Sequence, residues 1–441
     1  MSEYQCIVMG AAGRDFHVFL SFLRGNQQFR VKAFTATQIP FIDQRSFPQS
    51  LAGPGYDSDI PIYDESELPR LIQQHDIDFV FFAYSDILHA DIMHKASQVQ
   101  AAGASFVMLG PDHTQLASAK PVVSVTATRT GAGKSPLTQW LARLLTDRGK
   151  RVAVIRHPMP YGNLDMQRVQ RFASPQDLAE QQCTIEEREE YEPYVDMGIP
   201  IYAGVDYEAV LDQAAVDADV VLWDGGNNDF SFIRPDLDVV VVDALRAGHE
   251  TDYFPGEVNF RRADVLIISK CGSALPGSVD GIRERAARLN PKAVICRSDL
   301  RIQVDDAERL VGKRVLVIED GPTVTHGGMA FGAGMVAAER HGAIPVDPRP
   351  YAVGTIRDTF EANPHLERVL PAMGYSEKQR ESLASTINAC CAAENVSCVL
   401  DASPARLDRM MQLDVPLIRV AYRFVQLDGP PLEERVMQLL E

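Results

Sequence analysis

Short apolar runs alternate with helical, amphipathic stretches along the first quarter of the chain. The apolar runs lie at residues 5–9, 31–35, 79–84 and 106–109, and helix-like stretches of mixed polarity separate them. Strands that alternate with helices in this way predict a parallel sheet with helices on its faces. The sequence therefore predicts a Rossmann-like α/β domain over residues 1–118.

After a turn-rich stretch the apolar runs become continuous rather than alternating. They lie at residues 122–127, 152–156, 220–224, 239–243, 265–269, 293–296 and 315–319, with further candidates at 397–401 and 416–422. Continuous apolar runs are typical of strands that helices cover on both faces. Residues 277–288 and 358–394 are predicted to be helical. We expect a second α/β domain over 119–300 and a C-terminal α/β extension over 301–441, packed on the same sheet.

The apolar run 122–127 leads into T-R-T-G-A-G-K-S and then into an amphipathic helix. Strand, glycine-rich loop and helix in this order predict a phosphate-loop NTPase, because glycines let backbone N–H groups point at phosphates and the lysine reaches the β- and γ-phosphates. The helix N-terminus adds partial positive charge. Thr128 stands where the motif has its first glycine. The predicted nucleotide-binding residues are Thr130, Gly131, Ala132, Gly133, Lys134, Ser135 and Pro136.

Charge and composition narrow the class of partner. The formal net charge is −17, which argues against nucleic acid as the main partner, because nucleic acids are held by an excess of Lys and Arg. No apolar run is long enough for a membrane helix, and the first residues lack the pattern of a secretory signal. The seven cysteines include no C-x-x-C pair. We expect a cytoplasmic enzyme without a membrane or nucleic-acid partner.

Two residues beside the loop are candidates for phosphoryl-transfer chemistry. Asp224 ends an apolar strand, and a carboxylate at this position of phosphate-loop enzymes holds Mg²⁺ together with the Ser135 hydroxyl. Arg129 lies five residues before Lys134, where one class of phosphate-loop ATPases carries a second basic residue that reaches a neighbouring subunit. This position favours a homodimer with Arg129 as a catalytic residue. The alternative is that Arg129 is a solvated loop residue.

Basic residues near strand ends are candidates for binding an anionic substrate. Arg14 follows the first glycine turn, and Arg156 and His157 leave a strand beside the loop. Arg168 and Arg171 are expected on one helix face, where arginine suits phosphate or carboxylate recognition. A solvated basic face is the alternative interpretation. The polar, glycine-rich stretch 317–328 adds Glu319 as a catalytic candidate and His326 as a substrate-binding one.

Two further stretches are predicted not to contribute to the site or to guanine recognition. The acidic run 185–192 is predicted to be a solvated helix. The stretch S-K-C-G at 269–272 lacks the aspartate with which guanine-specific proteins read the base, so it favours ATP over GTP.

Taken together, the chain resembles cyclic 2,3-diphosphoglycerate synthetase and its bacterial phosphate-loop GTPase relatives. The matching stretches run in order from residue 4 to about 375, besides the loop itself. They are G-A-A-G-R-D-F-H (10–17), A-F-T-A-T-Q-I-P (33–40), L-A-G-P (51–54), R-H-P-M-P-Y-G (156–162), C-T-I-E-E-R-E-E-Y-E-P (183–193), Y-A-G-V-D-Y-E (202–208), W-D-G-G-N-N-D (223–229), Y-F-P-G-E-V-N (253–259) and E-D-G-P-T (319–323).

This resemblance implies an ATP- and Mg²⁺-dependent ligase. It would phosphorylate 2,3-diphosphoglycerate and close it to an intramolecular phosphoanhydride, releasing ADP and phosphate. The arginines would neutralise this small anionic substrate, and Lys134, Ser135 and Asp224 would position ATP and Mg²⁺.

Two alternatives stay open. One is a nucleotide-hydrolysing switch, using GTP or ATP, that assists cofactor or metal insertion or acts on another phosphorylated metabolite. A D-x-x-G switch motif is missing, since Gly-Gly-Asn follows Asp224. The other is a module whose first domain senses a dinucleotide, although G-A-A-G-R lacks the third glycine of that fingerprint.

Overall fold

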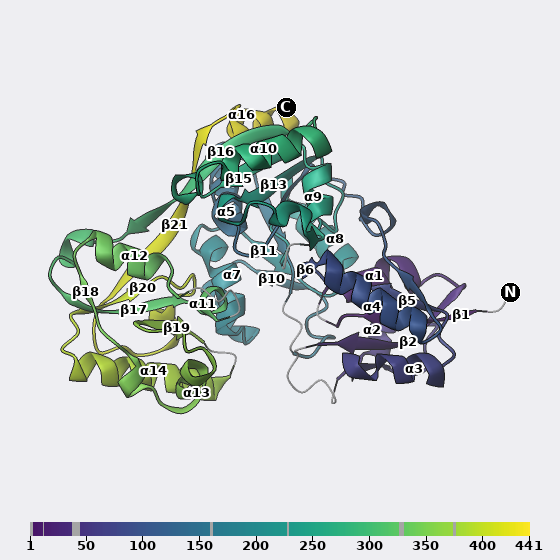
Figure 1. The fold of residues 1–441 in the computed structure, drawn as a ribbon, viewed down its shortest axis with the longest axis horizontal. Coiled ribbons are helices and arrows are strands. Elements are labelled where there is room, and N and C mark those ends of the chain that lie inside the picture. Colours follow the sequence, from purple (N-terminus) through teal and green to yellow (C-terminus); the bar gives the residue numbers. More distant parts are fainter. Residues whose placement is uncertain are drawn as a thin grey trace.

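The computed structural model describes residues 3–11, 13–37, 45–158, 162–226, 229–325, 330–373 and 376–441. It has an α/β fold with mainly parallel sheets, as the sequence predicts. Three bodies lie side by side in Figure 1, with the N-terminal body on the right, the phosphate-loop body in the centre and the C-terminal body on the left.

The N-terminal body is a sheet in the order β3-β4-β2-β1-β5-β7, parallel except at β3. Apolar residues on both faces pack against its helices. Its strands are β1 (Tyr4–Met9), β2 (Phe29–Ala36), β3 (Ser46–Phe47), β4 (Ile60–Asp64), β5 (Phe79–Phe82) and β7 (Ser105–Val107). Its helices are α1 (Arg14–Val18), α2 (Gln49–Ala52), α3 (Leu68–Gln74) and α4 (His89–Ala101).

The central body is built on a separate sheet, which begins in the order β10-β11-β9-β12-β8-β13-β15-β16. Its strands are β8 (Val122–Ala127), β9 (Val152–Arg156), β10 (Gln170–Phe172), β11 (Ile201–Ala203), β12 (Val220–Trp223), β13 (Leu237–Asp243), β15 (Val265–Ser269) and β16 (Val294–Val304). Its helices are α5 (Lys134–Asp147), α6 (Pro175–Glu180), α7 (Ile185–Asp196), α8 (Tyr207–Asp217), α9 (Gly256–Arg262), α10 (Ser278–Leu289) and α16 (Leu432–Leu439). A small antiparallel pair, β6 (Ile87–Leu88) with β14 (Tyr253–Phe254), ties this body to the N-terminal one.

Long strands carry the sheet from the central body into the C-terminal one. β16 pairs antiparallel with β21 (Leu417–Asp428), whose first residues pair with β20. The remaining C-terminal strands are β17 (Arg314–Asp320), β18 (Ile344–Pro345), β19 (Val369–Ala372) and β20 (Cys398–Asp401). The helices are α11 (Gly321–Val324), α12 (Ala333–Arg340), α13 (Gly354–Ala362), α14 (Glu377–Ala393) and α15 (Leu407–Met410). The domain limits at 118 and 300 remain a prediction.

Three local predictions were wrong. β16 extends to Val304, well past the predicted end at residue 296, because β21 supplies a hydrogen-bonding partner for the added length. The strand β19 interrupts the stretch 358–394 that was predicted to be helical, and pairs with β17. Arg168 and Arg171 do not share a helix, since Arg171 lies in strand β10 and Arg168 in the turn before it.

The acidic helix α7 is also not solvated, contrary to the prediction. Glu186, Glu187, Glu189 and Glu192 are buried. Glu192 accepts a hydrogen bond from the backbone N–H of Arg406 at 2.7 Å and another from the Arg188 guanidinium at 3.3 Å. Glu189 accepts one from the Ser403 hydroxyl at 2.9 Å. The helix therefore joins the central body to the C-terminal body through buried carboxylates.

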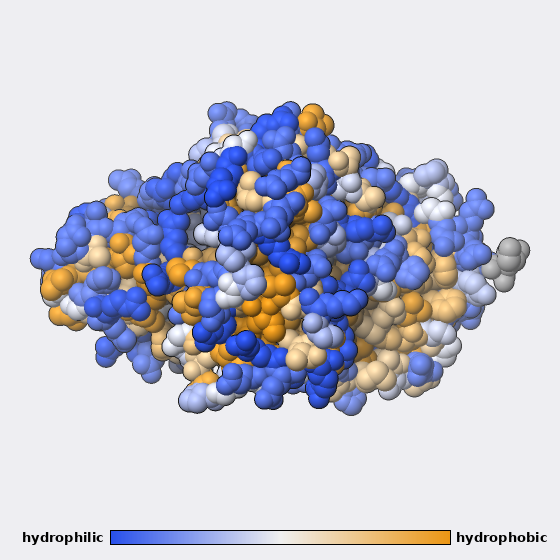
Figure 2. Space-filling model, turned by 90° about the horizontal axis from the view of Figure 1, so that it is seen from above, coloured by the Kyte–Doolittle hydropathy of each residue, from blue (hydrophilic) through white to orange (hydrophobic). Residues whose placement is uncertain are grey.

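On the face seen in Figure 2, polar side chains cover most of the area and apolar ones gather near the middle. Within the described ranges, every helix is too short or too polar to cross a membrane.

Replacing Glu192 by Ala tests the joining role of α7. Removing one partner of a buried charged network costs about 3 kcal/mol, because the remaining charges lose their counterpart. We expect the free energy of unfolding of Glu192→Ala to fall by this amount in urea titrations. The control Glu208→Ala, on the exposed side of α8, should stay within about 0.5 kcal/mol. Equal, small effects in both variants would contradict a joining role.

Candidate functional site

The phosphate loop lies between the carboxyl end of β8 and the start of α5. Gly131 has φ +76° and Gly133 has φ +108°, conformations that side chains rarely adopt. Thr128, which replaces the first glycine of the motif, has no positive φ and donates its backbone N–H to Val241 at 3.0 Å. A glycine is thus not required there. Burial and, to a smaller extent, the neighbouring Arg156 lower the pKa of the Lys134 ammonium to about 8.

Asp224 lies at the end of β12 and is completely buried. Its Oδ2 accepts hydrogen bonds from Arg156 at 2.7 Å and from the Tyr194 hydroxyl at 2.5 Å. Its Oδ1 accepts a hydrogen bond from Thr138, one turn into α5, at 3.0 Å. This carboxylate thus connects β12 and β9 to the helices α5 and α7.

Arg156 ends β9 and is held on two sides. One side carries the bonds to Asp224, including one to its backbone oxygen at 2.9 Å. The other pairs with Glu190 of α7. Carboxylates therefore balance the charge of Arg156, which sequence reasoning treated as free for a substrate.

A second buried charged group lies where the N-terminal body meets the central body. Arg14 is 3% exposed, and its guanidinium lies over the ring of Phe230, 4.2 Å from the ring centre. Its Nη1 is 3.6 Å from Oδ1 of Asp229, and His157 Nε2 is 3.4 Å from Oδ2 of the same carboxylate. Gly13 lies so close to His157 that a Cβ would come within 1.9 Å of the ring. We call Arg14, His157 and Asp229 the junction cluster.

The junction cluster carries unsatisfied polar atoms. Within the described part of the chain, Arg14 Nε and Nη1, His157 Nε2 and Asp229 Oδ1 are buried without a hydrogen-bond partner. Buried polar groups are normally hydrogen-bonded, and each one left unpaired costs about 1–3 kcal/mol. Burial lowers the pKa of Arg14, and the nearby Asp229 opposes that shift. Asp229 also slightly opposes the lowering of the Lys134 pKa, so the cluster is within electrostatic reach of the phosphate loop.

Arg129 is held within its own chain. Its Nε donates to Asp86 at 2.7 Å, its Nη1 lies 2.6 Å from His249 Nδ1, and its guanidinium lies 3.5 Å from the ring centre of Tyr253. Asp86 follows β5 of the N-terminal body and also accepts the backbone N–H of Thr130 at 3.4 Å. The N-terminal body thus touches the phosphate loop directly.

Sequence reasoning missed the residues behind the loop. Lys270 donates to the Gly131 carbonyl oxygen at 2.7 Å and to Asp243 at 3.0 Å, and Arg246 donates to the Thr130 carbonyl oxygen at 2.6 Å. Asp243 ends the apolar strand β13, and this position at the same sheet edge as Asp224 was the available signal. Asp86 offered the same kind of signal, since it follows the apolar strand β5, whereas Asp229 had none, because its partners are far away in the sequence.

The remaining predicted site residues lie away from the phosphate loop or outside the residues that the structure describes. Glu319 is buried in the C-terminal body and accepts the backbone N–H groups of Gly332, Gly334 and Met335 at the start of α12. Burial raises its pKa to about 7. Arg168 is exposed and pairs with Asp206 at 3.0 Å. Arg171 is exposed at the sheet edge, and His326 lies outside the described residues.

The donors for Mg²⁺ fit a metal that a nucleotide brings with it. Mg²⁺ bound to a nucleotide takes one or two protein oxygens and otherwise phosphates and water. The Asp224 Oδ1 atom accepts a hydrogen bond from Thr138 and keeps acceptor capacity, and Ser135 follows Lys134 in the first turn of α5. Among the residues that the structure describes, no group of three or more His, Cys, Asp or Glu side chains could hold a metal ion.

Comparison with known proteins identifies a close relative. The chain is 52% identical over 429 residues to arginine synthetase ArcE of Thermococcus kodakarensis, a match that covers 97% of this chain and 95% of that one. A tetraacyldisaccharide 4'-kinase of Dechloromonas aromatica is 31% identical over 123 residues, 27% of this chain and 34% of that one. No family model matches the chain.

Solved structures give only distant likenesses. LpxK from Aquifex aeolicus, in complex with ATP, has a TM-score of 0.42 at 13% identity and covers 74% of this chain and 89% of that one. The hydrogenase maturation factor HypB from Archaeoglobus fulgidus has a TM-score of 0.28 at 17% identity and covers 41% and 81%. These scores are too low to support an argument about function.

The resemblance inferred from the motifs is confirmed at a coarser level. The close relative is a synthetase, as the resemblance implied, but it carries a different name from cyclic 2,3-diphosphoglycerate synthetase. Since the identity extends over almost the whole of both chains, this chain belongs to the family of arginine synthetase ArcE.

Proposed function

We propose that this chain is an ATP-dependent synthetase that forms arginine by making a carbon–nitrogen bond of the guanidinium group. The observation that carries the proposal is the 52% identity to an arginine synthetase over nearly the full length. The phosphate loop before α5 and the junction cluster, which holds charges of both signs, support the same assignment.

The simplest reaction joins the ureido amino acid citrulline to ammonia. The ureido oxygen attacks the γ-phosphorus of ATP, and ADP leaves. Ammonia then attacks the ureido carbon, the carbon–oxygen bond breaks, and phosphate leaves with the oxygen. One ATP, one citrulline and one ammonia thus give arginine, ADP and phosphate. Most of the catalysis in such steps is alignment and charge stabilisation.

The phosphate loop supplies the nucleotide part of this site. Its backbone N–H groups and Lys134 would hold the β- and γ-phosphates. Mg²⁺, held by Ser135 and Asp224, would neutralise charge on the transferred phosphoryl group. Arg129 is fixed by Asp86 of the same chain, which supports a role on the nucleotide of its own subunit. The predicted homodimer is then not required for this residue to act.

ATP is the nucleotide that we propose. In guanine-specific proteins an aspartate accepts hydrogen bonds from the base, and Gly272 stands at that position here. Lys270 donates to the Gly131 carbonyl, so it supports the loop itself.

The junction cluster would hold the α-amino acid end of the substrate. Arg14 offers the planar Nε and Nη1 donors that suit a carboxylate, and Asp229 offers an oxygen that suits an ammonium group. Their burial makes each of these bonds strong once formed. The unpartnered nitrogens of Arg14 would thus bind the α-carboxylate of the substrate, and the unpartnered oxygen of Asp229 would bind its α-ammonium group.

Charge balance separates this proposal from ring closure of 2,3-diphosphoglycerate. That substrate carries several negative charges and no positive one. Asp224 and Glu190 already pair with Arg156, and Asp229 adds a negative charge beside Arg14, so an all-anionic substrate would meet carboxylates as well as cations. A zwitterion suits this mixture of charges better, so cyclic 2,3-diphosphoglycerate synthesis stays a prediction that the assay below also tests.

Product analysis is the direct test. The protein is incubated with ATP, Mg²⁺, ammonium and citrulline, or with ATP, Mg²⁺ and 2,3-diphosphoglycerate. We expect arginine, measured by mass spectrometry, in equal amount to ADP in the first mixture, and no new phosphorus NMR signal in the second. A cyclic diphosphate signal in the second mixture, or ADP formation that ignores both acceptors, would overturn the proposal.

Replacing Lys134 by Ala should lower ATP turnover by at least about 100-fold, because the loop loses the cation that offsets charge on the transferred phosphoryl group. Turnover is followed by ADP release. The control Lys313→Ala changes an exposed lysine of the C-terminal body and should leave turnover unchanged. Turnover that survives in Lys134→Ala would contradict the assignment of the loop.

Replacing Asp229 by Asn should raise the KM for the amino acid by about 10-fold, the effect of losing about 1.4 kcal/mol of binding. The ammonium group loses a charged partner, whereas the phosphates do not contact this side chain in the proposed arrangement. The KM for ATP should therefore change by less than about 2-fold. Asp212→Asn, at an exposed position of α8, is the matched control. Equal changes in both KM values would count against a role in amino-acid binding.

A further inference from the structure

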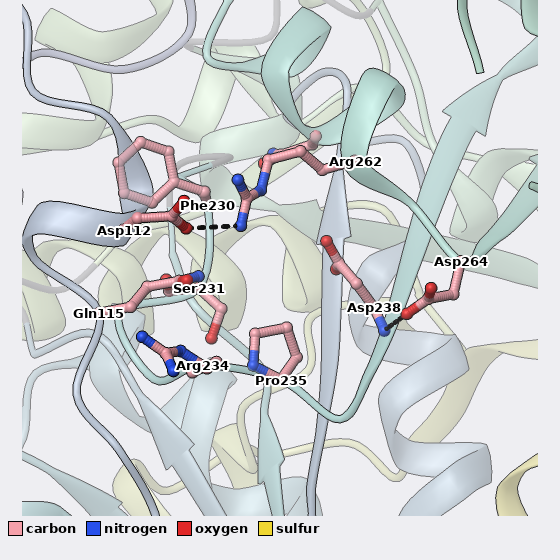
Figure 3. Close-up of a pocket in the computed structure, with 10 residues that line it drawn as sticks. Asp112, Gln115, Phe230, Ser231, Arg234, Pro235, Asp238, Arg262 and Asp264 are labelled. Carbon is pink, nitrogen blue, oxygen red and sulfur yellow. Dashed lines mark hydrogen bonds and ion pairs between the residues drawn. The ribbon is translucent and has the colours of Figure 1, made fainter. Parts of the chain in front are cut away.

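A cavity of about 290 Å³ lies at the opposite edge of the central sheet from the phosphate loop. It is bounded by the starts of β13 and β15, the end of α9 and the segments around Gln115 and Phe230 (Figure 3). Asp238 pairs with Ser124 near the start of β8, whereas the loop follows the end of that strand. The cavity is therefore about one strand length, roughly 15 Å, from the phosphate loop. Its size is at the lower end of the range for small-molecule sites.

The walls of the cavity carry opposite charges on opposite sides. Figure 3 shows Asp238 and Asp264 on one side, and Arg234 beside Gln115 on the other. Arg262 pairs with Asp112 at 3.0 Å. Because Arg262 and Asp112 balance each other, the charged groups left to contact a ligand are the carboxylates of Asp238 and Asp264 and the guanidinium of Arg234.

Polar groups in the cavity walls can still accept hydrogen bonds from a ligand. The Oε1 atom of Gln115 is buried and has no hydrogen-bond partner within the described ranges. Oδ1 of Asp238 accepts the Ser124 hydroxyl at 2.6 Å, and the backbone N–H of Asp238 donates to Asp264 at 2.8 Å. Burial and, to a smaller extent, the nearby Asp264 raise the pKa of Asp238 to about 6. A bound cation would relieve this carboxylate.

Three contacts link the cavity to the candidate active site. Asn259, which lines the cavity, donates to the carbonyl oxygen of Ala127 at 3.1 Å, just before the phosphate loop. Gly256, at the start of the same helix α9, lies so close that a Cβ would come within 2.2 Å of the Thr128 carbonyl oxygen. Phe230 lines the cavity and stacks on Arg14 of the junction cluster. A ligand that shifts α9 or Phe230 would thus reach both the loop and the cluster.

We propose that this cavity is a regulatory site for a basic α-amino acid, the chemical class of the product. Such a ligand carries two cations and one carboxylate, which complement Asp238, Asp264 and Arg234. The identity of the ligand rests on the proposed function, whereas the charge pattern does not. Binding there changes nucleotide affinity, and by linkage the nucleotide changes the affinity for the amino acid by the same factor.

Calorimetric titration of L-arginine into the full chain tests the site. Asp238→Asn keeps the shape and the acceptor for Ser124 but removes the charge, so we expect at least a 10-fold loss of affinity at the cavity. The exposed Arg234→Gln should weaken arginine but not agmatine, which has no carboxylate. Arg261→Gln, on the same helix but paired with Glu257, is the matched control and should bind as the unchanged chain does.

The active-site variant Asp229→Asn separates this site from the junction cluster. Binding that Asp238→Asn weakens and Asp229→Asn preserves supports the proposal. Arginine that binds equally to the unchanged chain and to Asp238→Asn, or that binds to neither, overturns it. If arginine binds at the cavity while the product assay yields no arginine, the proposed function is wrong and the proposed amino-acid site is still supported. Arginine should also alter ATP turnover in the unchanged chain and not in Asp238→Asn or Arg234→Gln.

Discussion

The buried ion pair between Asp224 and Arg156 is the interaction on which the site depends. It lies at the carboxyl edge of the central sheet, where β12 and β9 end side by side. Two charges this deep are stabilising only when further hydrogen bonds satisfy them. Thr138, Tyr194 and Glu190 provide those bonds from α5 and α7. The phosphate loop, the metal-binding candidate and the acidic helix are therefore held in one arrangement.

The same helix α7 explains how the C-terminal body is positioned. Its glutamates are directed to both sides, toward Arg156 in the central body and toward residues 403–409 in the C-terminal body. Carboxylates that are buried in such a network cannot be exchanged for a solvated surface without loss of the joint between the bodies. Together with the shared strands β16 and β21, this network gives the C-terminal body a fixed place relative to the loop.

On the other side the N-terminal body completes the site. Asp86 holds Arg129 at the loop, and Arg14 meets Asp229 and His157 at the junction cluster. Charged side chains at this junction, where two bodies meet, keep buried polar atoms without hydrogen-bond partners among the described residues. An amino-acid substrate that binds here would bridge the two bodies and satisfy those atoms at the same time. Substrate binding would therefore depend on the N-terminal body staying packed against the central body. Helix α9 connects the phosphate loop to the cavity at the far edge of the sheet.

The sequence alone determined the elements whose signals are local. β8, β9 and β15 have the predicted bounds, and the loop follows β8 as expected, because buried strands are continuous apolar runs and Gly131 and Gly133 adopt positive φ. Which charges meet depends on how the folded chain brings distant strand ends and helices together. Asp224 pairs with Arg156 across 68 positions and Arg129 with Asp86 across 43, and neither distance leaves a local signal. The acidic run could not be distinguished from a solvated helix, because its partners at 403–409 are brought to it only by the fold.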